Sequence, residues 1–149
     1  MDTVYDNIAV IGGTSVAPQS ISGSTAVDGS DVNTEGYASA ELYAYGAAAS
    51  GSPTAATLAV KLQESSDNST WTDALDNTGT VIGFTLTVTS AKAENAARIE
   101  GLNLNRKTYL RAVVTPSFTG GTSPASVAFA QILLGAAAQK PVDSNISNT

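Results

Sequence analysis

The sequence predicts an all-β fold, an antiparallel β-sandwich or jelly roll formed by a single domain. Three observations lead to this prediction. Apolar and polar residues alternate in several segments with the period of two expected of half-buried strands. Clusters of Gly, Asn, Asp and Ser, which favour tight turns, separate these segments. Finally, about eight such segments follow one another without long helices between them, which favours two packed antiparallel sheets.

The clearest strand covers residues 57–64, in which apolar and polar side chains alternate. It ends at residues 65–69, a run of Ser, Asp and Asn whose side chains bond their own backbone in turns. Trp71 then opens a short return strand. Residues 57–74 therefore predict a β-hairpin.

Two further strands are predicted near the C-terminus. The first covers residues 109–115, and we expect it to stop at Pro116, because proline cannot donate a hydrogen bond within a sheet. A turn containing Gly120-Gly121 follows, and residues 126–134 form the next strand. These two strands are expected to pair as a second hairpin.

The remaining segments give weaker signals. Weaker strands are expected at residues 5–11, 19–27, 38–46, 80–88 and 97–101. Residues 90–97 lean towards helix, with Ser90 as an N-cap, and a single helical turn and a loop are equal alternatives there. The polar composition after residue 138 predicts a sandwich domain over residues 1–138 and a flexible C-terminal tail over residues 139–149. The alternative is that this tail is an arm that becomes ordered against a neighbouring subunit.

The charge pattern limits the classes of partner. Thirteen acids against seven bases give a net charge of −6, which disfavours nucleic acid and anionic membranes as partners. Residues 1–60 contain six of the acids and no base, which serves either solubility or docking on a basic surface. Five bases cluster later in the chain, where they either pair within the molecule or mediate head-to-tail contacts between copies. These bases are Lys92, Arg98, Arg106, Lys107 and Arg111.

The chain offers little catalytic chemistry. It has no histidine and no cysteine, so the commonest general base and the thiolate nucleophile are missing. Nothing marks a particular pair of carboxylates for glycoside hydrolysis. The glycine pairs at residues 12–13 and 120–121 lack the context of a phosphate loop, and the Asp-rich turns at residues 28–31 and 67–68 lack the spacing of a calcium loop. We expect no enzyme activity, no cofactor and no metal site.

Six residues are candidates for an interaction surface, either between subunits, where tyrosine is favoured, or with a glycan. They are Tyr37, Tyr43, Tyr45, Trp71, Arg106 and Lys107. The segment Ser65–Trp71 resembles a degraded Asp-box, the hairpin turn of sialidase-like propellers. It predicts an Asp-capped hairpin followed by an aromatic side chain that packs on the core, with a sugar-stacking Trp71 as the alternative.

The order of these segments resembles small virion proteins of tailed bacteriophages, among them capsid decoration or cement proteins. The strings that carry the resemblance are residues 57–73, residues 106–115 and the apolar strand that ends near Gly135. The resemblance covers residues 30–142. It implies a structural protein made in the host cytoplasm and placed on the capsid exterior, where it clamps joints between capsomers.

The same resemblance implies the major capsid protein as partner and a homo-oligomeric state, with a trimer favoured. A carbohydrate-binding or receptor-binding module of a tail fibre or spike is the alternative function. A head-completion or tail-tube role also stays open, and a small glycosidase-like domain is the remaining enzyme hypothesis.

Overall fold

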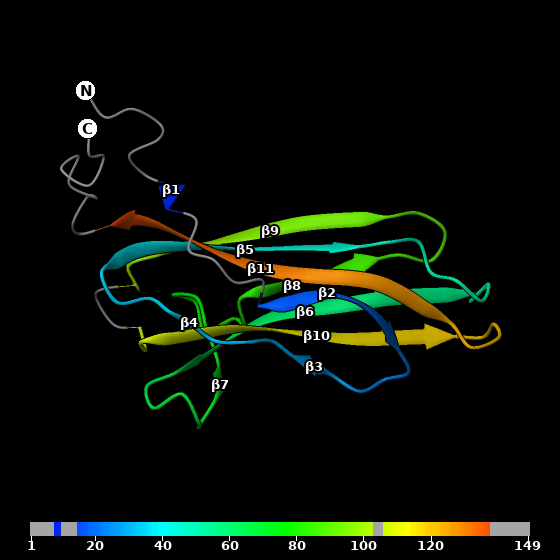
Figure 1. Cartoon of the computed structure of the whole chain (residues 1–149), viewed down its shortest axis with the longest axis horizontal. Helices are drawn as coiled ribbons and strands as arrows, with labels where there is room; N and C mark the ends of the chain where they lie inside the picture. The colour runs from blue at the N-terminus through cyan, green and yellow to red at the C-terminus, as the bar shows by residue number, and fades with distance from the viewer. Residues whose placement is uncertain (1–7, 10–14, 103–105, 138–149) are drawn as a thin grey trace, which may run out of the picture.

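The structure, a computed structural model, describes residues 8–9, 15–102 and 106–137, and the elements within these ranges are all β-strands. Figure 1 shows that most strands run along the long axis of an elongated molecule. The strands are β1 (Ile8–Ala9), β2 (Val16–Ser22), β3 (Val27–Asp28), β4 (Val32–Asn33), β5 (Tyr37–Gly46), β6 (Ala55–Ser65), β7 (Thr72–Asp73), β8 (Gly83–Thr87), β9 (Ala93–Glu100), β10 (Tyr109–Thr119) and β11 (Ala125–Ala137).

The strands form two antiparallel sheets with the topology of a jelly roll. Sheet A has the order β1-β11-β5-β9, with β2 also on β11; sheet B has the order β3-β10-β6-β7, with β4 also on β10 and β8 also on β6. The short strands β1 and β2, β3 and β4, and β7 and β8 each share one position. The chain thus has eight strand positions, which pair from the outside inward. The first (β1 and β2) pairs with the eighth (β11), and the second (β3 and β4) with the seventh (β10). The third (β5) pairs with the sixth (β9), and the fourth (β6) with the fifth (β7 and β8). This nesting is the double Greek key of jelly rolls, which confirms the predicted fold class.

The core lies between the two sheets, where alternate residues of each strand point inward. On β6, Leu58, Val60 and Leu62 are buried, as the sequence predicts. Over residues 126–134 of β11 the buried positions are the even-numbered ones, so small Ala128 and Ala130 share the inner face with large side chains further along the strand. The buried hydrophobic residues that sheet A contributes to the core are Val16, Ile21, Ala40, Leu42, Ala44, Ile99, Ala128, Ala130, Ile132 and Leu134.

The predicted C-terminal hairpin is wrong. β10 belongs to sheet B and β11 to sheet A, so the turn at Gly120-Gly121 joins the two layers and not two paired strands. The predicted stop at Pro116 is also wrong, because β10 runs on to Thr119. The Ala112 carbonyl accepts the Gly29 N–H on the side of β10 away from β6, and alternation places the Pro116 nitrogen on that same side. No strand pairs with β10 there among the described residues, so no hydrogen bond is lost.

The expectation for the helix-leaning segment, residues 90–97, is also wrong over most of its length. Neither a helical turn nor a loop covers residues 93–97, which form the first part of β9. The whole of β9 pairs with β5. Sheet pairing thus overrides the local helix preference of the Ala, Lys and Glu residues. The expected strands at residues 38–46 and 80–88 are confirmed as β5 and β8. The predicted tail over residues 139–149 lies outside the described residues, and the division into domain and tail stays a prediction.

Candidate functional site

The structure distributes the six predicted surface residues over three places. Tyr43 and Tyr45 lie on the outer face of sheet A, since their neighbours on β5 point into the core. Trp71 and Lys107 lie next to sheet B, in the segments that precede β7 and β10: Trp71 lies over an arginine of β10, and the Lys107 ammonium donates to Thr72 Oγ1 at 2.7 Å. The remaining two, Tyr37 and Arg106, line a pocket at one end of the sandwich. The predicted interface is therefore not one contiguous surface.

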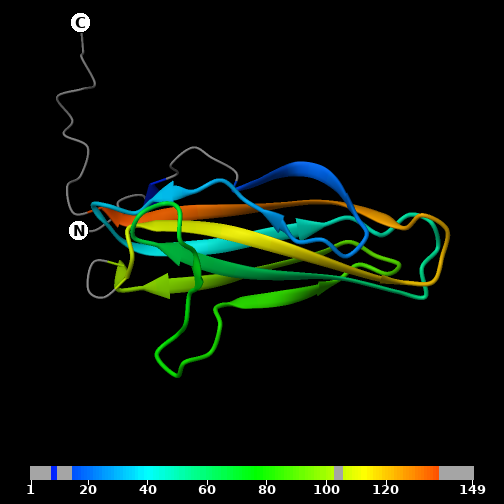
Figure 2. The same ribbon diagram turned by 90° about the horizontal axis from the view of Figure 1, so that it is seen from below.

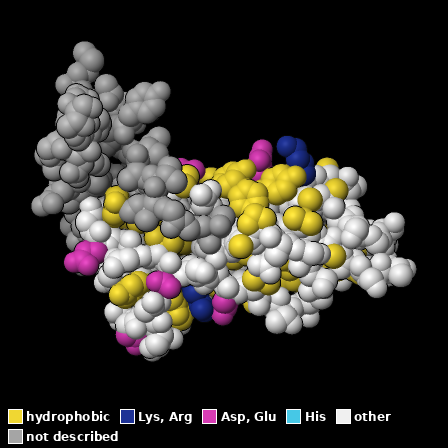
Figure 3. Space-filling model, viewed as in Figure 1, with side chains coloured by type: hydrophobic (Ala, Val, Ile, Leu, Met, Phe, Trp, Pro, Cys, Tyr) yellow, Lys and Arg dark blue, Asp and Glu magenta, His cyan; other side chains and the backbone are white. Residues whose placement is uncertain are grey.

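An aromatic cluster covers the centre of sheet A on its outer side. In the register of β11 with β5, Phe129 lies opposite Tyr45, and Gln131 opposite Tyr43. Val127, two residues before Phe129 and on the same face, is 52% exposed. Figure 3 shows apolar side chains gathered over this part of the molecule, with charged side chains at their margin. We call the surface formed by Tyr43, Tyr45, Val127 and Phe129 the aromatic face.

The rings of the aromatic face contact one another. Tyr45 and Phe129 are stacked, with centroids 5.7 Å apart and an interplanar angle of 23°. Tyr43 lies 6.0 Å from Phe129 at a tilt of 48°, and the Lys92 ammonium lies 6.0 Å from the centroid of Tyr45. Such pairs hold their members in place, because each ring restricts the rotamers of the next. The ring faces are thereby engaged within the cluster.

Charged residues of β5 and β9 border the aromatic face. The Tyr43 hydroxyl donates to Glu94 Oε2 at 2.8 Å, and this hydrogen bond raises the pKa of Tyr43 above its ordinary value. Arg98 pairs with Glu100 at 2.6 Å and lies opposite Glu41 in the strand register. An apolar centre with a charged rim is the usual composition of a protein–protein contact surface.

The outer face of sheet B is organised around Arg111. Its guanidinium donates two hydrogen bonds to Gln63 Oε1, at 2.9 and 2.7 Å, and pairs with Asp28 at 3.2 Å. Its central carbon lies 4.6 Å from the ring centroid of Trp71, a cation–π contact. The prediction that this aromatic packs on the core is wrong: Trp71 is half-buried against a charged network. Because Arg111 occupies one face of the Trp71 ring, only the other face is available for stacking with a sugar.

Ion pairs within the molecule explain most of the described bases. Besides the Arg111 pair, Lys61 binds Asp73 at 2.8 Å and Arg106 faces Glu64 at 3.6 Å. Together with the pair on β9, these contacts support the interpretation that the late cluster of bases pairs within the molecule.

Asp67 caps the turn between β6 and β7, as the sequence predicts. Its carboxylate accepts the backbone N–H groups of Ser69 and Thr70, at 3.0 and 2.7 Å, and the hydroxyls of Ser65 and Thr70. These bonds, the Thr70 N–H first among them, hold the pKa of Asp67 well below its usual range. Asn68 adopts a positive φ of 56°, which asparagine tolerates better than most residues.

A carboxylate with a lowered folded-state pKa stabilises the protein above its unfolded-state pKa, and this stabilisation is lost as pH falls through the folded-state value. For Asp67 that loss begins below about pH 4. We therefore expect D67N to lower the melting temperature at pH 7, because a neutral amide in place of the carboxylate loses the charge-assisted hydrogen bonds. The difference from the wild type should shrink as the pH is taken from 7 to 2.5 in a series of thermal melts. A difference that stays constant over this range would contradict the assignment.

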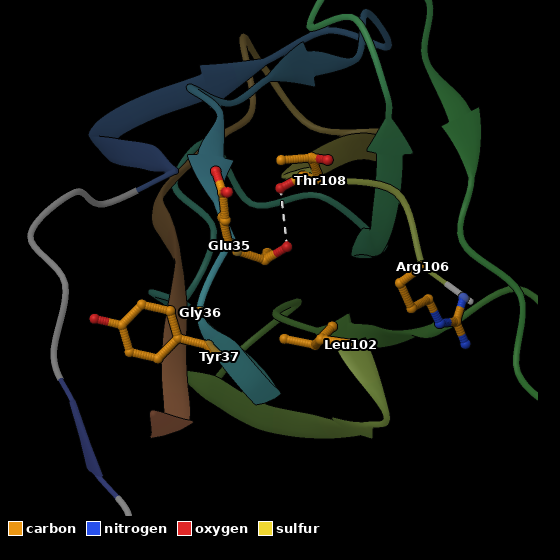
Figure 4. Close-up of a pocket in the computed structure, with 7 residues that line it drawn as sticks. Glu35, Gly36, Tyr37, Leu102, Arg106 and Thr108 are labelled. Atoms are coloured by element: carbon orange, nitrogen blue, oxygen red, sulfur yellow. Dashed lines mark hydrogen bonds between the residues drawn. The ribbon is translucent and has the colours of Figure 1, made fainter. Parts of the chain in front are cut away.

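The pocket at the end of the sandwich has a volume of about 330 Å³ and is open to solvent. Figure 4 shows Tyr37 and Arg106 on opposite sides of it, with Leu102 between them. The Thr34 hydroxyl donates to the Thr108 carbonyl at 2.9 Å. The volume lies at the lower limit for small-molecule sites. Its described lining brings no convergent set of polar groups together, so it offers no chemistry to assign.

Within residues 15–102 and 106–135, no group of three or more Asp and Glu side chains is arranged to hold a metal ion. The described part of the chain also contains no helix long and apolar enough to cross a membrane.

Sequence reasoning missed two residues of the aromatic face, Val127 and Phe129. It predicted a strand over residues 126–134 but did not assign its side chains to an inner and an outer face. The run Val127-Ala128-Phe129-Ala130 alternates large and small residues, and this alternation was the available signal. Which of the two sets faces outward depends on the register with β5, and a sequence alone does not give that register.

Comparisons with known proteins show likeness only at the level of fold. No family model and no curated protein matches the chain. A solved structure described as CBM4 aligns at 9% identity with a TM-score of 0.41, over 71% of this chain and 58% of that one. The C-terminal domain of EclA, described as a sugar-binding protein, aligns at 9% identity and TM-score 0.41, over 83% of this chain and 82% of that one. The SPBc2 prophage-derived protein YomS aligns at 13% identity and TM-score 0.29, over 85% of this chain and 99% of that one.

Proposed function

We propose that this protein is a non-enzymatic structural component of a phage virion. In this proposal it binds the outer surface of the capsid shell through the aromatic face of sheet A and stabilises the shell across capsomer joints. The observation that carries the proposal is the aromatic face itself. The partner is the major capsid protein.

The composition of the aromatic face supports a protein partner. Tyr and Phe are enriched in interface centres, where they lose little side-chain entropy on binding. Stacking between Tyr45 and Phe129 holds these rings in position before any partner arrives. The surface also lies on two central strands of a sheet, so it is rigid. Many copies of one rigid contact, repeated by the symmetry of a shell, give strong total attachment from modest single affinities.

A glycan is the second candidate ligand for the same aromatic residues. A pyranose ring stacks on the open face of an aromatic side chain. Here Tyr45 and Phe129 turn their faces towards each other, and Lys92 lies over Tyr45. Trp71 has one face against Arg111. These arrangements favour a protein surface over a sugar as the ligand.

The experiment that tests the proposal is co-sedimentation of the purified chain with mature heads of its phage, stripped of accessory proteins, and with immature shells. Saturable binding to mature heads, with a higher temperature of head disruption, is the expected result. Absence of binding to either shell, together with a change of Trp71 fluorescence on a glycan panel, would instead establish the carbohydrate-binding alternative.

A further inference from the structure

The free edge of β8 differs from the other free edges of the two sheets. β8 lies at the margin of sheet B, paired only with β6 among the described strands. Figure 2 shows it at the outer margin of the molecule, with the segment between β7 and β8 projecting beside it. From Asn77 to Ala91 the sequence contains neither a charged residue nor a proline. An unprotected, uncharged edge strand is a template for pairing with another strand.

The other sheet margins carry the devices that prevent such pairing. On β9, charged residues are spaced along the strand, and the Asn95 side chain accepts the Ala96 N–H. On β2, Pro18 lacks an N–H, and the register with β11 shifts between Ala128 and Ala130. The margin formed by β3 and β4 is divided into two strands of two residues each. Charges, proline, irregular register and short strands are the recognised ways of blocking an edge.

The backbone of β8 presents its hydrogen-bonding groups at alternate residues. The Val88 N–H donates to the Ala56 carbonyl at 2.9 Å, and the Ile82 carbonyl accepts the Leu62 N–H at 2.9 Å. Even-numbered residues of this segment therefore face β6, and alternation turns the N–H and C=O of the odd-numbered residues outward. These residues are Gly83, Thr85 and Thr87, all exposed.

Exposed apolar side chains mark the same edge. In the described part of the chain, three large apolar residues are strongly exposed. One is Val127, on the aromatic face. The other two, Leu75 and Val81, are 43% and 40% exposed and form a bridge with each other just before β8. A second strand paired with this edge would lie next to these two side chains and reduce their exposure.

We propose that the free edge of β8 pairs with β8 of a second copy, antiparallel and about a two-fold axis at Thr85. This register is self-complementary: Thr85 faces its own counterpart, and Gly83 faces Thr87 of the partner subunit. Threonine pairs are favourable across strands, and the glycine leaves room for the threonine opposite. Val81 then lies beside the small residues that follow the second copy's β8. Because the axis is two-fold, the assembly is a dimer, in contrast to the trimer that the resemblance to phage virion proteins implies.

The oligomeric state of the full chain tests this pairing. We expect sedimentation equilibrium to give a dimer for the wild type and at least roughly tenfold weaker association for T85K, because two like charges then face each other across the axis. T85P is expected to act likewise, since it removes an outward N–H and none that serves β6. A96K places the same charge on the blocked edge of β9 and should leave the dimer unchanged. Circular dichroism of each variant verifies that it is folded.

A single cysteine tests the register directly, because the chain has none of its own. Facing residues of a hydrogen-bonded antiparallel pair have Cα atoms about 5.5 Å apart, which suits a disulfide. T85C should therefore give a disulfide-linked dimer under mild oxidation, and T57C, on the central strand β6, should not.

Several results would overturn the pairing: a monomeric or trimeric wild type, a dimer unaffected by T85K, or equal cross-linking of T85C and T57C. A monomeric wild type whose shell binding is lost in T85K would show that the edge accepts a strand of the capsid protein. Dimerisation is measured without shells, so its outcome does not depend on whether the protein binds capsids.

Discussion

Replacing Tyr45 and Phe129 together by serine is expected to weaken binding to mature heads by roughly 100-fold or more, because central aromatic anchors each contribute about 2 kcal/mol or more to protein interfaces. Both side chains lie on the outer face of sheet A and contact each other, so their removal leaves no core cavity. The melting temperature should change little by comparison. Co-sedimentation over a range of protein concentrations measures the loss.

W71S is the matched control for this double variant. It removes an aromatic side chain of similar exposure from sheet B, where Trp71 contacts Arg111 and no residue of the aromatic face. Head binding by W71S should stay within about threefold of the wild type, since residues outside the contact centre contribute little. A stronger loss with W71S than with Y45S/F129S would place the contact on sheet B and contradict the proposal.

L58A is expected to have the largest effect on stability, lowering the free energy of unfolding by about 2–5 kcal/mol. Leu58 is fully buried between the sheets and its removal leaves a cavity. G46A should destabilise by about 1–3 kcal/mol for the opposite reason, since it overpacks the same place. A Cβ at Gly46 would lie 2.7 Å from Leu58 Cδ1 and 2.9 Å from Val88 Cγ1.

The two substitutions should partly compensate each other when combined. In G46A/L58A the added methyl group of sheet A enters the space that Leu58 of sheet B vacates. The double variant should therefore lose less stability than the two single variants together, by about 1 kcal/mol or more. Urea denaturation of the four proteins gives this coupling. Simple additivity would show that β5 and β6 do not face each other across the core at this point.

Local pattern predicted most strands and the hairpin of β6 with β7, but not the partners of the other strands. The alternation over residues 57–64 gives both the strand and its buried face, because period two and burial coincide there. The same kind of pattern gave two strands around Gly120-Gly121, yet the turn joins two sheets and not a hairpin. Turn residues specify that the chain reverses, and tertiary packing decides between a hairpin and a crossing of layers. Residues 93–97 show the same dependence, since β5 imposes a strand on a helix-favouring sequence.

The candidate surface was predicted only in part, for a related reason. Tyr43 and Tyr45 stand two apart on one strand, so their common face follows from the sequence. Their neighbours Val127 and Phe129 come from a strand far along the chain, and only the register brings them together. Trp71 was grouped with the tyrosines by residue type alone. Its actual neighbour, Arg111, is determined by how the turn capped by Asp67 folds back over sheet B.

Oxidative footprinting of the protein on mature heads is the sharpest test of whether the aromatic face contacts the shell, because it reports burial of individual aromatic side chains. Hydroxyl radicals modify exposed Tyr, Phe and Trp, and mass spectrometry compares the bound with the free protein. We expect strong protection of Tyr43, Tyr45 and Phe129 on binding and unchanged modification of Trp71. Protection of Trp71 with unchanged modification of the three residues of sheet A would contradict this contact.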